Sequence, residues 1–296
     1  MQTHDEYRRR LLMGMMTLPW WFSAAIAADE KLDPRRIIAL EWRPTELLLA
    51  LGVTPQAIAD APNYRNWVVE PPLALSVKDV GLRTEPNMEA LQRLRPSLLL
   101  LTKGYGPAAE SLASIAPVMS FPVQETPGLP FTTARQDVLA LGEYLGLADR
   151  ARQHLQVVEE QLARTRRRLN SVVSRPVLLF TFLDSQHVMV LGKGSMFQEI
   201  MDRVGVTNAW HGEVNRWGSA TVGFEQLAGL KDVRGLCFRR GDEDPLDDVV
   251  LSPLWQVIPF VRERQWQTVP AVWFFGATIA AMRFCRLLEQ SLVKTA

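Results

Sequence analysis

The pattern of apolar and polar positions is clearest around residues 79–107. Leucines 91 and 94 have helical spacing, and the apolar run Leu98 to Leu101 that follows indicates a buried strand. The Gly-Tyr-Gly turn around Tyr105 comes directly after that strand. The pattern therefore predicts a helix, a strand and a turn that presents Tyr105 at the carboxyl end of the strand.

The rest of the first half alternates in the same way between short apolar runs and amphipathic helices. The expected elements are a strand over residues 36–42 ending at Trp42, a helix over 44–51, a polar-aromatic loop over 63–67, a strand over 117–121 and a helix over 132–145. Alternating strands and helices are typical of a parallel sheet. We expect an α/β lobe over residues 28–145.

A single long helix is predicted next, because residues 148–171 contain neither proline nor glycine. Leu155, Val158, Leu162 and Leu169 have roughly helical spacing on it. We interpret its basic run, residues 164–168, as a solvated helix face. Residues 146–172 would then carry the chain from the first lobe to a second one.

The second lobe, residues 173–296, repeats the logic of the first. Strands are expected at 175–183 and 188–191, followed by a helix over 195–204. Two short segments of the first lobe recur here in the same order: Ala50-Leu-Gly-Val-Thr-Pro as Arg203-Val-Gly-Val-Thr-Asn, and the segment from Met88 as the segment from Phe224. The chain thus resembles two related lobes facing one cleft, with Glu89 and Glu225 in equivalent positions.

Residues 1–27 have the features of an export signal of the twin-arginine type. Consecutive arginines at 8–10 precede the apolar run Leu11 to Phe22, and the small-residue site Ala25-Ile-Ala27 follows. Cleavage is expected after Ala27. The alternative is a marginal membrane anchor, which Pro19 and the cleavage site disfavour.

Without residues 1–27 the chain has 30 basic and 30 acidic side chains, since the signal removes three arginines and two acids from totals of 33 and 32. A neutral chain offers no broad basic field for nucleic acid or anionic lipid. Cys237 and Cys285 each lie in an apolar run, and we expect two separate buried thiols.

Candidate ligand-binding residues gather at predicted strand ends, where open α/β sheets bind ligands. Arg83, in the loop before the central helix, and Tyr105 would offer a guanidinium and a phenol hydroxyl to oxygen acceptors. Tryptophans at positions 42, 67, 217 and 273 would supply an apolar wall for a bulky ligand. The alternatives are core packing for the tryptophans and a local ion pair of Arg83 with Glu85.

The sequence contains little that indicates catalysis. His154, His187 and His211 are isolated, and neither metal-ligand spacing nor a nucleophile motif is present. We interpret Gly192-Lys-Gly-Ser195 as a turn with a helix cap, because the spacing of a phosphate loop is missing. We therefore expect no catalytic residue and no protein-bound metal, although a catalytic set assembled from distant positions stays open.

Several motifs in register resemble the periplasmic ferric-hydroxamate siderophore-binding proteins, the FhuD family. They are Val80-Gly-Leu-Arg-Thr-Glu-Pro-Asn, Ala39-Leu-Glu-Trp-Arg-Pro-Thr-Glu, Gly104-Tyr-Gly-Pro, Asn215-Arg-Trp-Gly-Ser and Val269-Pro-Ala-Val-Trp-Phe-Phe-Gly. The resemblance implies a two-lobed α/β periplasmic binding protein with a parallel sheet in each lobe and one long connecting helix, the helical-backbone or class III type. It also implies a monomer that serves an inner-membrane ABC permease and its ATPase.

The resemblance also assigns roles to residues. Arg83 and Tyr105 would hydrogen-bond the iron-hydroxamate oxygens, and the surrounding wall would comprise Trp42, Trp67, Leu183, Met189, Trp210, Asn215, Trp217, Ser219, Trp273 and Phe275. Glu89 and Glu225 would dock onto the permease. Iron would arrive already chelated, so no cofactor is needed. Leu101 and Phe275 depart from the family's tryptophan and tyrosine, which leaves the preferred siderophore open.

Two alternative functions stay open. A binding protein of this fold could carry another bulky chelate, haem or a cobalamin, and a periplasmic siderophore hydrolase would belong to a different class. A hydrolase needs a nucleophile with a base, whereas a binding protein needs donors and a wall. The sequence offers donors and a wall.

Overall fold

The computed structural model describes residues 32–123, 128–170, 174–239 and 249–293, and the predicted signal lies outside them. By their contacts, residues 32–296 form one compact unit. Two separate sheets lie within it, one from residues 37–121 and one from residues 177–269. No helix of the described ranges is long and apolar enough to cross a membrane. The domain boundaries at residues 27, 145 and 172 stay predictions.

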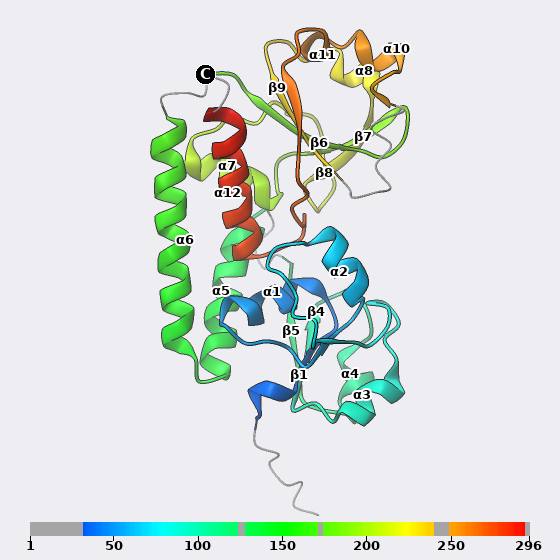
Figure 1. Ribbon diagram of the computed structural model, residues 1–296, viewed down its shortest axis with the longest axis vertical. Helices are drawn as coiled ribbons and strands as arrows, with labels where there is room; N and C mark the ends of the chain where they lie inside the picture. The colour runs from blue at the N-terminus through cyan, green and yellow to red at the C-terminus, as the bar shows by residue number, and fades with distance from the viewer. Residues whose placement is uncertain (1–31, 124–127, 171–173, 240–248, 294–296) are drawn as a thin grey trace, which may run out of the picture. The chain divides into compact units, whose positions relative to one another are not determined.

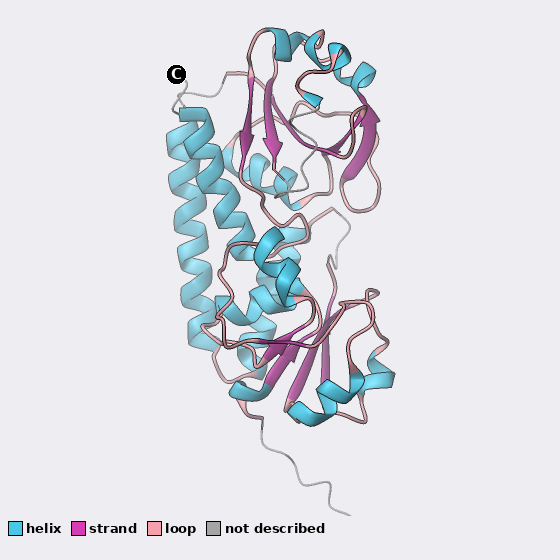
Figure 2. Cartoon of the chain, turned by 45° about the vertical axis from the view of Figure 1, so that its right-hand side comes forward, coloured by secondary structure: helices cyan, strands magenta, loops and turns pink. Residues whose placement is uncertain are grey.

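The first sheet is entirely parallel, with strand order β3-β2-β1-β4-β5. Its strands are β1 (Ile37–Ala39), β2 (Ala57–Ile58), β3 (Lys78–Asp79), β4 (Leu98–Thr102) and β5 (Val118–Phe121). The predicted leucine strand is β4, whose five residues are all buried because helices cover both faces (Figure 2). The order reverses direction between β1 and β4, which places a crevice at their carboxyl ends.

Short helices connect these strands: α1 (Trp42–Ala50), α2 (Ala61–Trp67), α3 (Met88–Leu94) and α4 (Ala109–Leu112). The strand expected to run to Trp42 ends at Ala39, because Glu41 caps α1 by accepting a hydrogen bond from the Arg43 N–H. The prediction of a loop over residues 63–67 was wrong. This segment belongs to helix α2, which Pro62 helps to start and whose Tyr64 is fully buried beside Trp42.

The second sheet has strand order β10-β9-β6-β7-β8. Its strands are β6 (Val177–Phe182), β7 (His187–Leu191), β8 (Ser219–Gly223), β9 (Arg234–Phe238) and β10 (Trp266–Val269). The predicted parallel pairing holds for β6, β9 and β10, whereas β7 and β8 pair antiparallel. The connection from β6 to β7 is too short for a parallel crossover, so it closes a hairpin.

The helices of this half are α7 (Met196–Val204), α8 (Phe224–Leu227), α10 (Pro253–Gln256) and α11 (Pro259–Arg262). The first pair of repeated sequence segments adopts matching structures, whereas in the second pair α3 has 7 residues and α8 has 4. Helices α1 and α7 are each followed by a glycine with positive φ, Gly52 at 70° and Gly205 at 77°. In each case the next residue's N–H bonds to a carbonyl five positions back.

Three longer helices, α5 (Pro130–Tyr144), α6 (Ala148–Leu169) and α12 (Thr278–Val293), pack against one another (Figure 1). Helix α6 is the predicted long helix. Its polar contacts with α12 include a 2.7 Å hydrogen bond between His154 and Thr278 and a 2.8 Å ion pair between Arg168 and Glu289.

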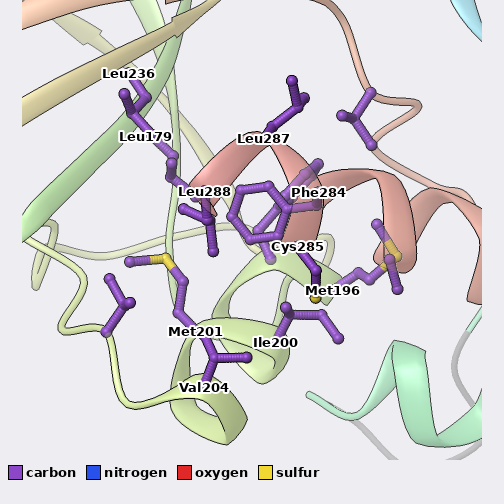
Figure 3. Close-up of a cluster of buried hydrophobic side chains, with 14 of the residues drawn as sticks. Leu179, Met196, Ile200, Met201, Val204, Leu236, Phe284, Cys285, Leu287 and Leu288 are labelled. Atoms are coloured by element: carbon purple, nitrogen blue, oxygen red, sulfur yellow. The ribbon is translucent and has the colours of Figure 1, made fainter. Parts of the chain in front are cut away.

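The apolar core of the second half includes α7, α12 and strands of its sheet, as Figure 3 shows for Leu179, Ile200 and Phe284. Cys285 belongs to this core, and burial raises the pKa of its thiol to about 12. Cys237 is buried in a different apolar cluster, the one that includes Trp255. The two thiols are separate, as predicted.

Two buried glutamates bind helix N-termini across the chain. Glu46 on α1 accepts hydrogen bonds from the N–H groups of Ala277, Ile279 and Ala280, at 2.7 to 2.8 Å, where α12 begins. Glu199 on α7 does the same for Phe131 and Thr132, where α5 begins. Each glutamate lies six residues before the glycine of its repeat. The two halves therefore use one capping device at equivalent positions.

Candidate ligand-binding cavity

A cavity of about 300 Å³ lies at the carboxyl ends of the first sheet's strands. Glu41 follows β1, Arg83 follows β3, Thr102 ends β4 and Val123 follows β5. Tyr105 lies in the turn after β4, and the remaining lining comes from the second half: Trp217, Trp273 and Phe275. Parallel strands bring these separate positions together because their carboxyl ends meet at one edge.

Arg83 occupies the polar side of the cavity and is held by several contacts. Its Nη1 donates to Glu41 Oε1 over 2.7 Å, and its Nε lies 3.8 Å from Asp60 Oδ2. The guanidinium carbon stands 3.8 Å from the centre of the Trp42 ring. Ion pairing and cation–π contact orient the fork before any ligand is present. The ion partners are therefore Glu41 and Asp60 rather than the neighbouring Glu85.

Tyr105 is brought to Arg83 by the glycines on either side of it. Gly104 and Gly106 both have positive φ, at 77° and 78°. A Cβ atom on Gly106 would lie 2.7 Å from the Arg83 carbonyl oxygen, so only glycine permits this close backbone approach. The Tyr105 ring centre lies 5.4 Å from the guanidinium carbon, and the side chain is 41% exposed. Both donors thus remain near one another with the phenol open to a ligand.

The part of the lining that comes from the second half is aromatic, and its Trp273 ring centre lies 5.4 Å from the Arg83 guanidinium carbon. Trp273 meets Phe275 with ring centres 5.6 Å apart, and Phe275 meets Trp217 at the same distance, both edge to face. Trp273 also contacts Trp42, at 4.7 Å. The rings form a continuous chain from beneath Arg83 to Trp217. Such a wall gives apolar contact with little directional demand on the ligand.

Asn215 and Ser219 hold the turn that carries Trp217. Asn215 Oδ1 accepts a hydrogen bond from the Trp217 N–H over 2.8 Å, and Asn215 Nδ2 donates to Ser219 Oγ over 3.1 Å. Gly218 between them has a φ of 74°. In this arrangement both polar side chains are engaged with the turn, and they fix the ring that lines the cavity.

The structure thus brings five of the predicted wall and donor residues to one cavity: Arg83, Tyr105, Trp217, Trp273 and Phe275. Trp42 lies behind Arg83, is 2% exposed and donates its indole N–H to the Ala59 carbonyl. The remaining predicted residues are placed elsewhere: Trp67 against the first core, Leu183 in the β6–β7 hairpin, Met189 within β7 and Trp210 in a separate depression with His211 and Glu213.

Sequence reasoning missed three lining residues, Glu41, Thr102 and Val123. Each follows or ends a strand of the first sheet, which is the signal that pointed to Trp42 and Tyr105. Glu41 faces the cavity and pairs with Arg83, which lies 42 positions further along the chain.

The described residues contain no group of three or more His, Cys, Asp or Glu side chains that could hold a metal ion. His154 bonds to Thr278, and His187 bonds to the exposed Asp184 at 3.0 Å. Neither histidine lines the cavity.

These features are those of a solute-binding protein: two sheets flanked by helices, a cavity at strand carboxyl ends, and a preformed donor pair beside aromatic rings. The chain belongs to the periplasmic binding protein family, which residues 37–272 match. It is a binding protein rather than an enzyme, as its relatives are. Membership of this family implies a location outside the cytoplasm.

Among its relatives, the iron(3+)-hydroxamate-binding protein FhuD of Escherichia coli is 46% identical over 287 residues, which cover 96% of each chain. The Fe(3+) dicitrate-binding periplasmic protein FecB of the same species is 24% identical and covers 87% of this chain and 86% of its own. The solved structure of the siderophore-binding protein FhuD from Vibrio cholerae with Fe3+-Desferal has a TM-score of 0.83, at 25% identity over 89% of this chain and all of its own. The predicted family and fold are confirmed.

Proposed function

We propose that the protein captures iron(III)-hydroxamate siderophores in the periplasm and delivers them to an inner-membrane ABC permease. The observation that carries this proposal is the 46% identity, over 96% of both chains, to a protein named for binding iron(3+)-hydroxamate. The cavity supports it, because its donors and its aromatic wall suit a compact, oxygen-rich centre on a bulky organic frame.

Arg83 and Tyr105 are the proposed contacts to the iron-hydroxamate oxygens. The guanidinium offers N–H donors in a planar fork, and the phenol offers one O–H donor. Glu41 and Trp42 already hold the fork in place, so ligand binding need not order it. The hydroxamate oxygens occupy the iron's coordination sites, and the protein would bind the chelate without ligating the metal.

Trp217, Trp273 and Phe275 are the proposed contacts to the organic part of the siderophore. Such a wall of rings accepts many shapes because dispersion and apolar burial are non-directional. We assign Asn215 and Ser219 to supporting Trp217, on the hydrogen bonds they make in its turn. Contacts from Trp67, Leu183, Met189 and Trp210 stay predictions.

Glu89 and Glu225 are the proposed docking residues for the permease. Glu89 lies in the first turn of α3 and Glu225 in the first turn of α8, and both are exposed. One belongs to each half of the chain, at equivalent positions of the repeat. Paired carboxylates on a monomer would suit paired basic groups on a permease that works with its ATPase.

Titration of intrinsic tryptophan fluorescence tests this function, since two of the proposed contact residues, Trp217 and Trp273, are tryptophans. Ferric hydroxamates such as ferrichrome and ferrioxamine should quench the signal with micromolar affinity, while the iron-free forms, a ferric catecholate, haem and a cobalamin should bind more weakly. Iron-free siderophores are flexible and lose entropy on binding. Recovery of chemically unchanged ligand excludes a hydrolase, and tight binding only of haem or cobalamin would overturn the proposal.

A further inference from the structure

We propose that Glu41 sets the charge selectivity of the cavity. By pairing with Arg83 it makes the cavity's charged lining neutral overall, so that neutral ferric chelates bind in preference to anionic ones. The inference rests on the proposed function in one respect, namely that the ligand is a ferric chelate. It adds a residue that determines which chelates are accepted.

The charge balance follows from the lining itself. Among the described residues that line the cavity, Glu41 and Arg83 are the ones that carry a charge. Their side chains meet at 2.7 Å. Asp60, which does not line the cavity, places a second carboxylate 3.8 Å from the same guanidinium. A ligand entering here meets an arginine whose charge is already matched.

The Glu41 carboxylate is held in position by three groups. Oε1 accepts from Arg83 Nη1, while Oε2 accepts from the Arg43 N–H over 2.8 Å and from Thr102 Oγ1 over 3.3 Å. The residue caps α1 and is 6% exposed. These bonds keep the carboxylate beside Arg83 when ligand arrives. The ligand therefore senses an oriented dipole and not a free cation.

Chelates differ in the charge that they bring to this dipole. Hydroxamate anions balance the charge of iron(III), so a ferric hydroxamate centre is neutral. Ferric tris-catecholate complexes carry excess negative charge. An unpaired Arg83 would attract a negative ligand, and in a partly buried site the paired Glu41 offsets that attraction by roughly tenfold or more in affinity. Glu41 thus disfavours anionic chelates while it orients the donor that neutral chelates use.

Glu41→Gln tests this, because the amide keeps the side chain's shape and removes its charge. We measure the affinities of ferrichrome, a neutral probe, and of a ferric tris-catecholate, an anionic probe. The ratio of catecholate to ferrichrome affinity should rise roughly tenfold or more. Added salt should weaken catecholate binding to the variant more than to the wild type, because Arg83 then keeps only the more distant carboxylate of Asp60. Glu85→Gln, which alters an exposed carboxylate outside the cavity lining, is the matched control and should leave the ratio unchanged.

Because Glu41→Gln also alters the α1 cap, a second variant tests the charge effect with that cap intact. Asp60→Asn removes the outer carboxylate without touching the cap, and asparagine tolerates the positive φ of 56° at this position. It should shift the ratio in the same direction by a smaller factor. An unchanged ratio in folded Glu41→Gln and Asp60→Asn, or an equal loss for both probes, overturns the inference. Failure of the wild type to bind ferrichrome overturns the proposed function instead, and the catecholate series still reports on Glu41.

Discussion

The two sides of the cavity are built on different principles. The side from the first half consists of groups with fixed directions, since Arg83, Glu41 and Thr102 are joined by hydrogen bonds and Tyr105 is fixed by its glycines. The side from the second half is a chain of rings, Trp273, Phe275 and Trp217, without such directional contacts among them. In the proposed function, directional donors would select the metal centre, whereas rings would tolerate variation in the frame around it.

The aromatic side nevertheless depends on the first half for its position. Trp273 and Phe275 lie directly before α12, whose N-terminus is bound by Glu46 of α1. Glu46 is almost fully buried, and burial raises the pKa of its carboxyl although the three N–H donors and Arg43 oppose that shift. The positions of Trp273 and Phe275 therefore depend on contacts from α1, which include this cap and the bond from Arg43 Nη1 to the Gly276 carbonyl.

The largest expected effect comes from removing that contact. Glu46→Ala should lower the free energy of unfolding by about 3 kcal/mol, because it leaves buried N–H groups unpaired and opens a cavity. The equivalent Glu199→Ala should cost less, about 2 kcal/mol, since Glu199 is 8% exposed and Glu46 only 1%. Denaturant unfolding measures both. Equal stabilities of Glu46→Ala and wild type would show that the cap is not needed.

Arg83→Ala should remove the directional side. Affinity should fall by about 1.5 to 3 kcal/mol, the range for charge-assisted hydrogen bonds. The loss should be similar for ferrichrome and ferrioxamine, because both present the same iron-hydroxamate centre. Arg93→Ala, on the exposed face of α3, is the control and should bind like wild type. Undiminished affinity in an Arg83→Ala variant that melts like wild type would contradict the assigned role.

Trp217→Ala should weaken the tolerant side. We expect a loss of about 1 to 2 kcal/mol from reduced apolar contact, and its size should vary among siderophores with different frames. Fluorescence of the remaining tryptophans or calorimetry measures it. A loss that is uniform across siderophores would mean that Trp217 contacts the iron centre and that the division between the two sides is wrong.

His154 on α6 hydrogen-bonds to Thr278, the first residue of α12. We expect this partly buried imidazole to make the stability of the folded protein depend on pH. Burial lowers the pKa of its imidazole in the folded protein. As pH falls below about 6.5, the unfolded chain takes up a proton that the folded chain resists, so the free energy of unfolding decreases. His154→Gln should reduce this decrease between pH 7 and 5. Parallel stability curves for variant and wild type would remove His154 from this account.

Glu89 and Glu225 should have no effect on either side of the cavity. The double variant Glu89→Ala with Glu225→Ala should retain siderophore affinity, because both carboxylates are exposed and lie outside the cavity lining. It should reduce uptake in cells that lack the endogenous protein, because the charges proposed to dock on the permease are gone. Uptake of labelled ferric siderophore and fluorescence binding separate the two effects. Lost affinity would place the glutamates in the site, and normal uptake would make them ordinary solvated acids.

Sequence patterns predicted the elements around the cavity better than they predicted its lining. The leucine strand, the Gly-Tyr-Gly turn and the long helix are each marked by local composition, and all three are present. The α2 helix was missed because Asn63 to Trp67 has no apolar period of its own, and burial of Tyr64 stabilises it. The pairing of Glu41 with Arg83 joins residues 42 positions apart, and no local pattern reveals it.

The capping glutamates show the same limit. Their positions in the repeated segments are visible in the sequence, but their partners lie at 131–132 and 277–280, where no motif points back to them. Such contacts depend on how the helices pack, which a single sequence specifies only through the complete fold.

The most direct test of the central claim is a structure of the protein with a bound ferric hydroxamate. We predict hydroxamate oxygens within about 2.7 to 3.2 Å of an Arg83 guanidinium nitrogen and of the Tyr105 hydroxyl. The Trp217 and Trp273 rings should lie against the organic frame, and the iron should have no protein ligand. A siderophore seated in the depression around Trp210 and His211, or in the cavity but out of reach of Arg83, would contradict the account.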